Sequence, residues 1–154
     1  MKIFKIILIF VFFFQVSCGY KIVNNLDNFK FKIIDYKLTG EKKINNILEK
    51  NFKRFESSDA ISTSDFIIHA NNEINRFITS KNTAGETLSY DLRISIIIEI
   101  YENGSLLNEK TCNENTSYDN LDNKFELKQY ENILIQDLTN QMVIKINNHL
   151  NSIK

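Results

Sequence analysis

The residues Leu88–Tyr101 alternate between apolar and polar side chains, and this alternation constrains the fold more than any other feature of the sequence. Every even-numbered position is apolar, and most odd-numbered positions are polar, with Ile97 and Tyr101 as exceptions. A period of two over this length predicts a long β-strand with one buried and one mostly hydrated face. Asn103-Gly104 follows, and this dipeptide readily adopts the positive φ angles of a tight hairpin turn. We therefore expect the chain to reverse there and helices to cover the apolar face of the strand.

Changes of period mark the other elements. Alternation predicts further strands, whereas apolar residues spaced by three or four predict amphipathic helices. Thr39-Gly40 is expected to break the first strand, and Ser80–Glu86 reads as a polar turn. The expected elements are a strand at Asn28–Tyr36, a helix at Glu41–Phe55, strands at Asp65–Thr79, Leu88–Tyr101 and Ser105–Ser117, and a last helix capped by Asn123 and Glu126.

Three details of these elements bear on the fold. The polar middle of the second strand, Asn71-Asn72-Glu73, indicates a bulge or a split, although one long strand is the preferred interpretation. The polar strand Ser105–Ser117 is expected to form an edge of the sheet or to protrude past the core. A two-residue turn would pair Ile98 with Glu109, unless a longer loop or a bulge intervenes. In the last helix an apolar stripe typical of a core recurs every four residues, at Tyr130, Leu134, Leu138, Met142, Ile146 and Leu150.

The order β-α-β-β-β-α predicts an α+β two-layer domain, with a sheet of about four strands and two helices packed on one face. A chain of 154 residues has room for one such domain, which we place at residues 28–154. Its 19 basic and 19 acidic residues give no net charge, which argues against a nucleic-acid partner.

The N-terminal residues Met1–Ser17 have the charged start, short apolar middle and small final residue of an export signal. The apolar run is too short to span a bilayer comfortably, although a retained anchor helix is the alternative. With Cys18 next, the segment resembles a bacterial lipoprotein signal, in which this cysteine is lipidated and becomes the new N-terminus. Gln15 departs from that pattern, which usually has leucine or another small or apolar residue there. Residues 18–27 would then form a lipidated tether.

No catalytic or metal-binding pattern stands out in the sequence. His69 and His149 lack partners at metal-ligand spacing, and neither a phosphate-binding glycine loop nor a nucleophile elbow is present. Cys112 has no intramolecular partner if Cys18 is lipidated, so we expect a small residue packed in a strand rather than a reactive thiol. The sequence therefore predicts a protein that is not an enzyme and needs no cofactor.

Three short motifs carry a resemblance to a known family. They are the lipidation site Ser17-Cys18-Gly19-Tyr20, then Gly85 followed by Tyr90-Asp91-Leu92 at the start of the long strand, and Thr116-Ser117-Tyr118-Asp119 before the last helix. Together with the order of the elements, they resemble the LptE family of outer-membrane lipoproteins, which assist lipopolysaccharide assembly as partners of the β-barrel protein LptD.

The resemblance implies a location and a role. The protein would lie on the periplasmic face of the outer membrane, held by acyl chains such as palmitate on Cys18. It would plug the LptD barrel, help to assemble it and assist delivery of lipopolysaccharide to the outer leaflet. The family is also expected to contact lipopolysaccharide phosphates through basic side chains near strand turns. Here the candidates are Arg76, Lys81, Lys124 and Lys128, and the alternative is that they are solvated surface residues.

Two other functions are compatible with the sequence. One is a periplasmic lipoprotein that binds and activates a cell-wall enzyme. The other is a secreted small-ligand binder or hydrolase whose site is assembled from residues distant in sequence. Co-purification with a large outer-membrane barrel or with a periplasmic enzyme separates the first two possibilities, and a deep apolar pocket with convergent polar groups would favour the third.

The lipidation site gives the first testable prediction. Mass spectrometry of the native protein should find residues 1–17 removed and the sulfur of Cys18 acylated, and Cys18→Ser should abolish both changes. Cys112→Ser serves as the control and should leave processing intact. A native protein with its leader attached and a bare Cys18 sulfur would contradict the predicted tether and compartment.

Overall fold

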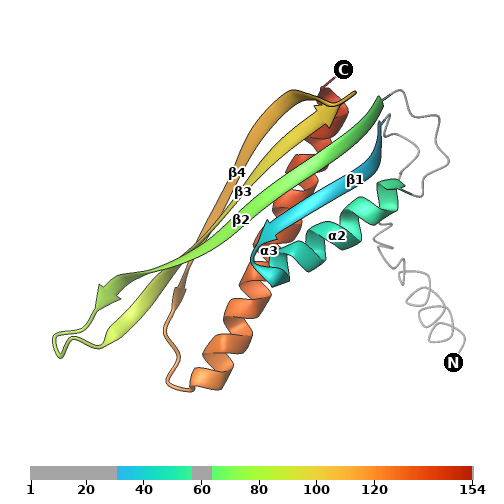
Figure 1. Ribbon diagram of the computed structural model, residues 1–154. Coiled ribbons are helices and arrows are strands. Elements are labelled where there is room, and N and C mark those ends of the chain that lie inside the picture. Colours follow the sequence, from blue (N-terminus) through green and yellow to red (C-terminus); the bar gives the residue numbers. More distant parts are fainter. Residues whose placement is uncertain (1–30, 57–63, 154) are drawn as a thin grey trace, which may run out of the picture.

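The computed structural model describes residues 31–56 and 64–153 (Figure 1). Residues 1–30 lie outside this part of the chain, so the leader, Cys18, the tether and the first residues of the predicted strand at Asn28–Tyr36 are not described. The elements in chain order are β1 (Phe31–Gly40), α2 (Lys42–Glu56), β2 (Ser64–Lys81), β3 (Thr87–Glu102), β4 (Ser105–Asp119) and α3 (Lys124–Ser152).

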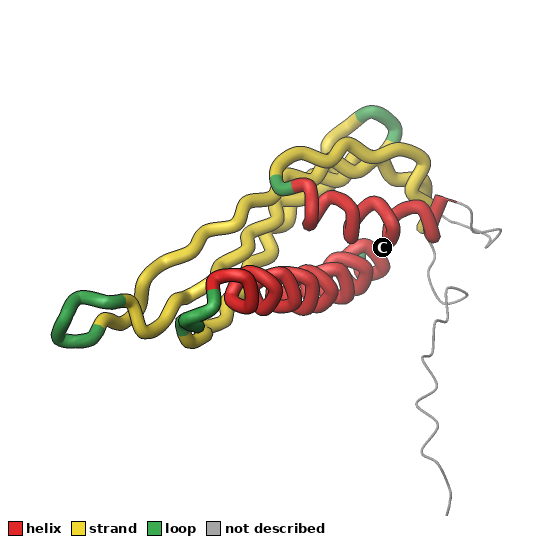
Figure 2. The backbone as a smooth tube through the Cα atoms, turned by 90° about the horizontal axis from the view of Figure 1, so that it is seen from below, coloured by secondary structure: helices red, strands yellow, loops and turns green. Residues whose placement is uncertain are grey.

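The strands form one mixed sheet in the order β1-β2-β3-β4, and both helices lie on the same face of it (Figure 2). Strand β1 runs parallel to β2, and the other neighbours are antiparallel. A parallel pair needs a crossover connection, and α2 lies in that crossover. The predicted α+β two-layer fold with the order β-α-β-β-β-α is therefore confirmed.

The apolar face of β3 lies at the centre of the core. Its side chains from Leu92 to Ile100 at even positions are at most 2% exposed. The prediction is wrong for Leu88, which is 49% exposed, because the β2–β3 hairpin projects beyond the helices at that end (Figure 1). The predicted turn after β3 is confirmed, since Asn103 and Gly104 have φ angles of 52° and 78°.

Strand β1 ends at Gly40, so the predicted break at Thr39-Gly40 is confirmed, although the strand continues past the predicted end at Tyr36. Gly40 has a φ of 103°, and a Cβ atom added there would lie 1.9 Å from the carbonyl oxygen of Asn72. Only glycine allows the chain to leave β1 so close to β2 and to enter α2 two residues later.

Asn72 explains why the polar middle of β2 neither bulges nor splits. Its side chain is buried on the covered face, where Oδ1 accepts a hydrogen bond from the Glu41 backbone N–H at 2.9 Å. Its Nδ2 donates to the Thr39 carbonyl oxygen at 2.9 Å and to Oδ1 of Asn45 at 2.7 Å. The preferred interpretation of a single long strand is confirmed, and Asn72 attaches the β1–α2 turn to the sheet.

The last hairpin combines the two-residue turn with a bulge. Glu102 pairs with Ser105 across the turn, but a register shift next to Ile100 places Ile98 opposite Lys110 instead of Glu109. Strand β4 forms an edge of the sheet, as predicted. Cys112 is a free, buried residue of this strand, and burial raises the pKa of its thiol.

Helix α3 has the predicted cap, because Oδ1 of Asn123 accepts hydrogen bonds from the backbone N–H groups of Phe125 and Glu126. The predicted stripe is wrong at Tyr130, which is 42% exposed, whereas Leu127 and Glu131 are buried. An α-helix has 3.6 residues per turn, so residues spaced four apart shift around the helix axis by about 40° at each step. Such a stripe therefore cannot face the sheet along the whole length of α3.

Adjacent residues of β3 provide a matched pair of variants to test the assignment of faces. Ile96→Asp should lower the free energy of unfolding by more than about 4 kcal/mol, or prevent folding, because it buries an unpaired charge. Ile97→Asp, on the uncovered face where the native side chain is 38% exposed, should cost only about 1 kcal/mol. Urea unfolding followed by circular dichroism measures both. Similar stabilities for the two variants would mean that the faces are wrongly assigned.

Candidate functional site

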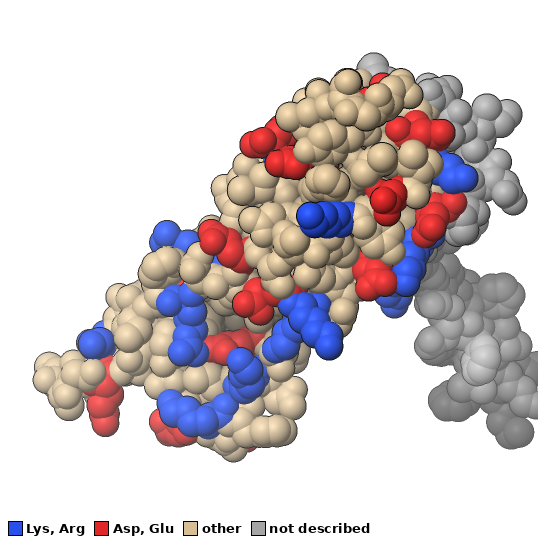
Figure 3. Space-filling model, in the orientation of Figure 1, with Lys and Arg blue, Asp and Glu red and all other residues tan. Residues whose placement is uncertain are grey.

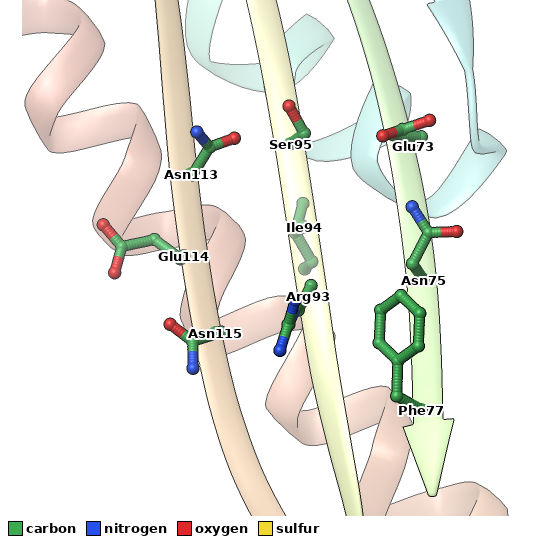
Figure 4. A pocket seen from close by; sticks show the side chains of 9 residues that line it. All are labelled: Glu73, Asn75, Phe77, Arg93, Ile94, Ser95, Asn113, Glu114 and Asn115. Atoms are coloured by element: carbon green, nitrogen blue, oxygen red, sulfur yellow. The ribbon is translucent and has the colours of Figure 1, made fainter.

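The uncovered face of the sheet carries a shallow groove across β2, β3 and β4 (Figure 4). Its volume is about 520 Å³, and most of its lining residues carry amide, hydroxyl or carboxylate side chains. The groove is lined by Glu73, Asn75, Phe77, Arg93, Ile94, Ser95, Asn113, Glu114 and Asn115. Such side chains both donate and accept hydrogen bonds, so the groove suits a polar or hydrated partner surface.

A buried carboxylate fixes the wall of this groove. Asp91 accepts a hydrogen bond from Nε of Arg93 at 2.6 Å, and longer ones, at 3.4 Å, from Asn115 Nδ2 and Ser117 Oγ. The bond from Arg93 is the main reason why the pKa of Asp91 is lowered. The Arg93 guanidinium lies 4.8 Å from the centre of the Phe77 ring. The charges of Asp91 and Arg93 are thus paired with each other, which leaves the amide groups to determine what the groove can bind.

A second polar depression of about 310 Å³ extends the uncovered face towards β1. Here Nδ1 of His69 lies 3.7 Å from Oε2 of Glu99, which also accepts a hydrogen bond from the Tyr101 hydroxyl at 2.8 Å. The other histidine, His149 in α3, lies with Nε2 2.9 Å from Oδ1 of Asn108. Burial is the main reason why the pKa of His149 is lowered. These contacts agree with the surface and structural positions expected for lone histidines.

On the covered face, one cluster connects α3 to β2 and β4. Glu131 is buried, and its Oε1 accepts hydrogen bonds from Nη1 of Arg76 at 2.7 Å and from the Tyr118 hydroxyl at 2.6 Å. The Arg76 guanidinium lies 4.7 Å from the centre of the Tyr90 ring, which stacks on Tyr118 at 5.5 Å. The cluster attaches the N-terminal half of α3 to the sheet where the apolar core ends.

The cluster changes the acidity of its members. Burial alone would raise the pKa of Glu131, but the hydrogen bonds from Tyr118 and Arg76 outweigh burial and lower it. Burial and the hydrogen bond to Glu131 raise the pKa of Tyr118. Glu131 is therefore held ionised and Tyr118 protonated at neutral pH.

The structure brings the four predicted basic residues to the same end of the molecule. Lys81 pairs across the hairpin with Thr87, which lines a groove of about 440 Å³ together with Tyr90 and Lys124. Arg76 lies against Tyr90, and the charge of Lys128 contributes to the lowered pKa of Glu131. Figure 3 shows Lys and Arg side chains gathered over this half of the molecule, with carboxylates among them.

Arg76 differs from the three lysines because Glu131 already pairs its charge. Sequence reasoning missed Glu131, although a signal was present. Helical spacing places Glu131 in line with Leu127 and Ile135, which are both buried, and an acidic residue in such a stripe indicates a buried partner.

Within residues 31–56 and 64–153, no group of three or more His, Cys, Asp and Glu side chains is arranged to hold a metal ion. None of the helices in these ranges combines the length and the apolar character needed to cross a bilayer. That the protein is not an enzyme stays a prediction.

The comparisons with known proteins find a shared fold. No protein-family model matches the sequence, and no curated protein matches it. The uncharacterized lipoprotein B from Nitrosomonas europaea matches 87% of this chain and 91% of its own, with a TM-score of 0.62 and 17% identity. The minor lipoprotein from Acinetobacter baumannii matches 77% of this chain and 90% of its own, with a TM-score of 0.56 and 13% identity. The rare lipoprotein B from Shewanella oneidensis matches 75% of this chain and 89% of its own, with a TM-score of 0.50 and 12% identity.

These three neighbours are bacterial lipoproteins, and each is covered along most of its length. The likeness supports the fold implied by the resemblance to the LptE family. At such low identity it is a likeness of fold, and function has to be argued from the surface of this chain.

The Glu131 cluster gives a prediction about stability and pH. Glu131→Gln should lower the free energy of unfolding at pH 7 by about 1–2 kcal/mol, because Arg76 loses the charge that pairs it. Folding lowers the pKa of Glu131. The ionised carboxylate therefore stabilises the fold at pH values above the unfolded-state pKa of Glu131, and this stabilisation is lost as the pH falls through its folded-state pKa. Urea unfolding between pH 7 and pH 3 should therefore show a shallower decline in stability for this variant.

Asp137→Asn, an exposed change on the same helix, is the control and should follow the wild-type pH dependence. A decline that is equally steep in Glu131→Gln and in the wild type would exclude the cluster as its source.

Proposed function

We propose that this chain is a non-enzymatic outer-membrane lipoprotein of the LptE type. In this role it occupies the lumen of a large β-barrel translocon, helps the barrel to assemble and assists delivery of lipopolysaccharide to the outer leaflet. The observation that carries the proposal is the fold, which this chain shares with bacterial lipoproteins over most of their length.

The shape and the uncovered face support the proposal. The molecule is elongated, and its β2–β3 hairpin projects beyond the helices (Figure 1). The uncovered face is rich in neutral amides such as Asn75, Asn113 and Asn115. Barrel lumens wide enough to hold a protein are lined by polar side chains and water. A wedge with a hydrated amide face can be accommodated there, because lumen side chains and water provide hydrogen-bond partners.

The end of the molecule that carries the candidate cations supports the contact with lipopolysaccharide. Lys81, Lys124 and Lys128 are exposed, and among the described residues none of them has an ion pair. Phosphates on the lipid would bind these free ammonium groups, whereas Arg76 is already paired with Glu131. Phe125, next to Lys124, is 70% exposed and offers apolar surface for the acyl region.

Depletion followed by complementation tests the proposal. Depletion should lower surface lipopolysaccharide and the abundance of the correctly oxidised barrel, and the wild-type protein should co-purify with that barrel in detergent. In the depleted strain, Lys81→Gln with Lys124→Gln should retain the barrel and lose co-purified lipopolysaccharide by about fivefold or more, because two phosphate-binding charges are removed.

Lys42→Gln with Lys110→Gln removes the same charge from exposed positions outside this end of the molecule and is the matched control. Normal surface lipopolysaccharide and barrel on depletion would contradict the proposal. Capture of a periplasmic cell-wall enzyme instead of the barrel would favour the alternative lipoprotein role.

A further inference from the structure

A groove of about 680 Å³ lies between α2 and α3, on the side of the helices away from the candidate site. Its walls come from the middle and end of α2 and from the C-terminal half of α3. The groove is lined by Ile47, Lys50, Asn51, Arg54, Asn140, Val143, Ile144 and Asn147. Neither the barrel contact nor the lipopolysaccharide contact proposed above uses these residues.

The polar part of the groove is cationic. Lys50 and Arg54 contribute two positive charges, and no carboxylate is among the lining residues. The other polar residues of its wall, Asn51, Asn140 and Asn147, carry no charge.

The apolar part of the groove is open to solvent. Ile144 is 60% exposed on α3, although α3 is covered by the sheet on its other side, and Ile47 and Val143 lie along the same groove. Cations beside exposed aliphatic side chains match an amphiphile with an anionic head and a hydrocarbon tail.

The groove also lies near the place where the membrane tether joins the fold. Phe31, the first described residue, has its ring 4.9 Å from that of Phe55 in the last turn of α2, next to Arg54 in the sequence. Thirteen residue steps separate Cys18 from Phe31. Even fully extended, they span at most about 45 Å. A lipidated Cys18 would therefore keep the groove close to the bilayer surface.

We propose that the groove between α2 and α3 binds the headgroup of an anionic glycerophospholipid, of the phosphatidylglycerol kind, in the membrane that anchors the chain. The phosphate lies between Lys50 and Arg54, and the first acyl carbons pack on Ile144. This inference rests on the membrane anchor of the proposed function, but not on the barrel or on lipopolysaccharide.

Headgroup chemistry distinguishes the common membrane lipids. Phosphatidylglycerol carries a net negative charge, which Lys50 and Arg54 attract. Phosphatidylethanolamine and phosphatidylcholine carry an additional positively charged nitrogen, which these two cations repel. Phosphatidylglycerol is therefore expected to bind more strongly than either of them.

Photo-crosslinking of the full chain reconstituted into vesicles tests the proposal. With p-benzoylphenylalanine in place of Ile144, ultraviolet light should attach phosphatidylglycerol from vesicles that contain it in phosphatidylcholine, as read by mass spectrometry. Lys50→Gln with Arg54→Gln should lower this yield by about fivefold or more, since both charges that hold the phosphate are lost. The probe in place of Ile133, exposed on α3 but outside the groove, is the positional control.

Lys42→Gln with Lys110→Gln is the charge control and should leave the yield unchanged, while circular dichroism checks that all variants are folded. Equal lipid labelling from positions 133 and 144, or labelling unaffected by the Lys50 and Arg54 changes, would overturn the proposal. So would crosslinks to protein alone. Failure of the chain to float with the vesicles would overturn both the anchor and the groove, whereas floating chain without lipid crosslinks would overturn the groove alone.

Discussion

The structure depends on covering one long apolar strand face. Strands β2 and β3 have 18 and 16 residues. At about 3.3 Å per residue they are roughly 50–60 Å long. Helix α2, with 15 residues, covers only about 22 Å, whereas α3, with 29 residues, covers about 44 Å. One long helix is therefore required beside the sheet, and the end of the β2–β3 hairpin remains uncovered. The elongated shape follows from this difference in rise per residue.

Two polar clusters attach the helices to the sheet. In the middle of β2, the side chain of Asn72 forms hydrogen bonds with the backbone of the β1–α2 turn, and Gly40 allows the close approach that this requires. Nearer the β2–β3 hairpin, Glu131 binds Arg76 and Tyr118 and thereby fixes α3 on the sheet. Each cluster pairs groups that would otherwise be buried without partners. The two clusters thus determine where the helices lie along the strands.

The same arrangement leaves two surfaces for partners. The uncovered sheet face does not pack against the helices, so its amides and the guanidinium of Arg93 are available to a hydrated surface. The helix layer presents the groove that contains Lys50 and Arg54. In the proposed functions the hairpin end of the molecule enters the barrel lumen with its uncovered sheet face, whereas the groove, near Phe31 and the tether, faces the bilayer.

The sequence by itself determined the type and order of the elements, the central place of β3 and the cap at Asn123, because periodicity and capping are local properties of a segment. Only the tertiary structure decided the rest. Arg76 and Glu131 are 55 residues apart and carry no common local signal. The bulge next to Ile100 and the rotation that exposes Tyr130 likewise depend on how one element lies against another. A local pattern reports which face of an element is buried, whereas partners and register depend on free energies that exist only after the elements have packed.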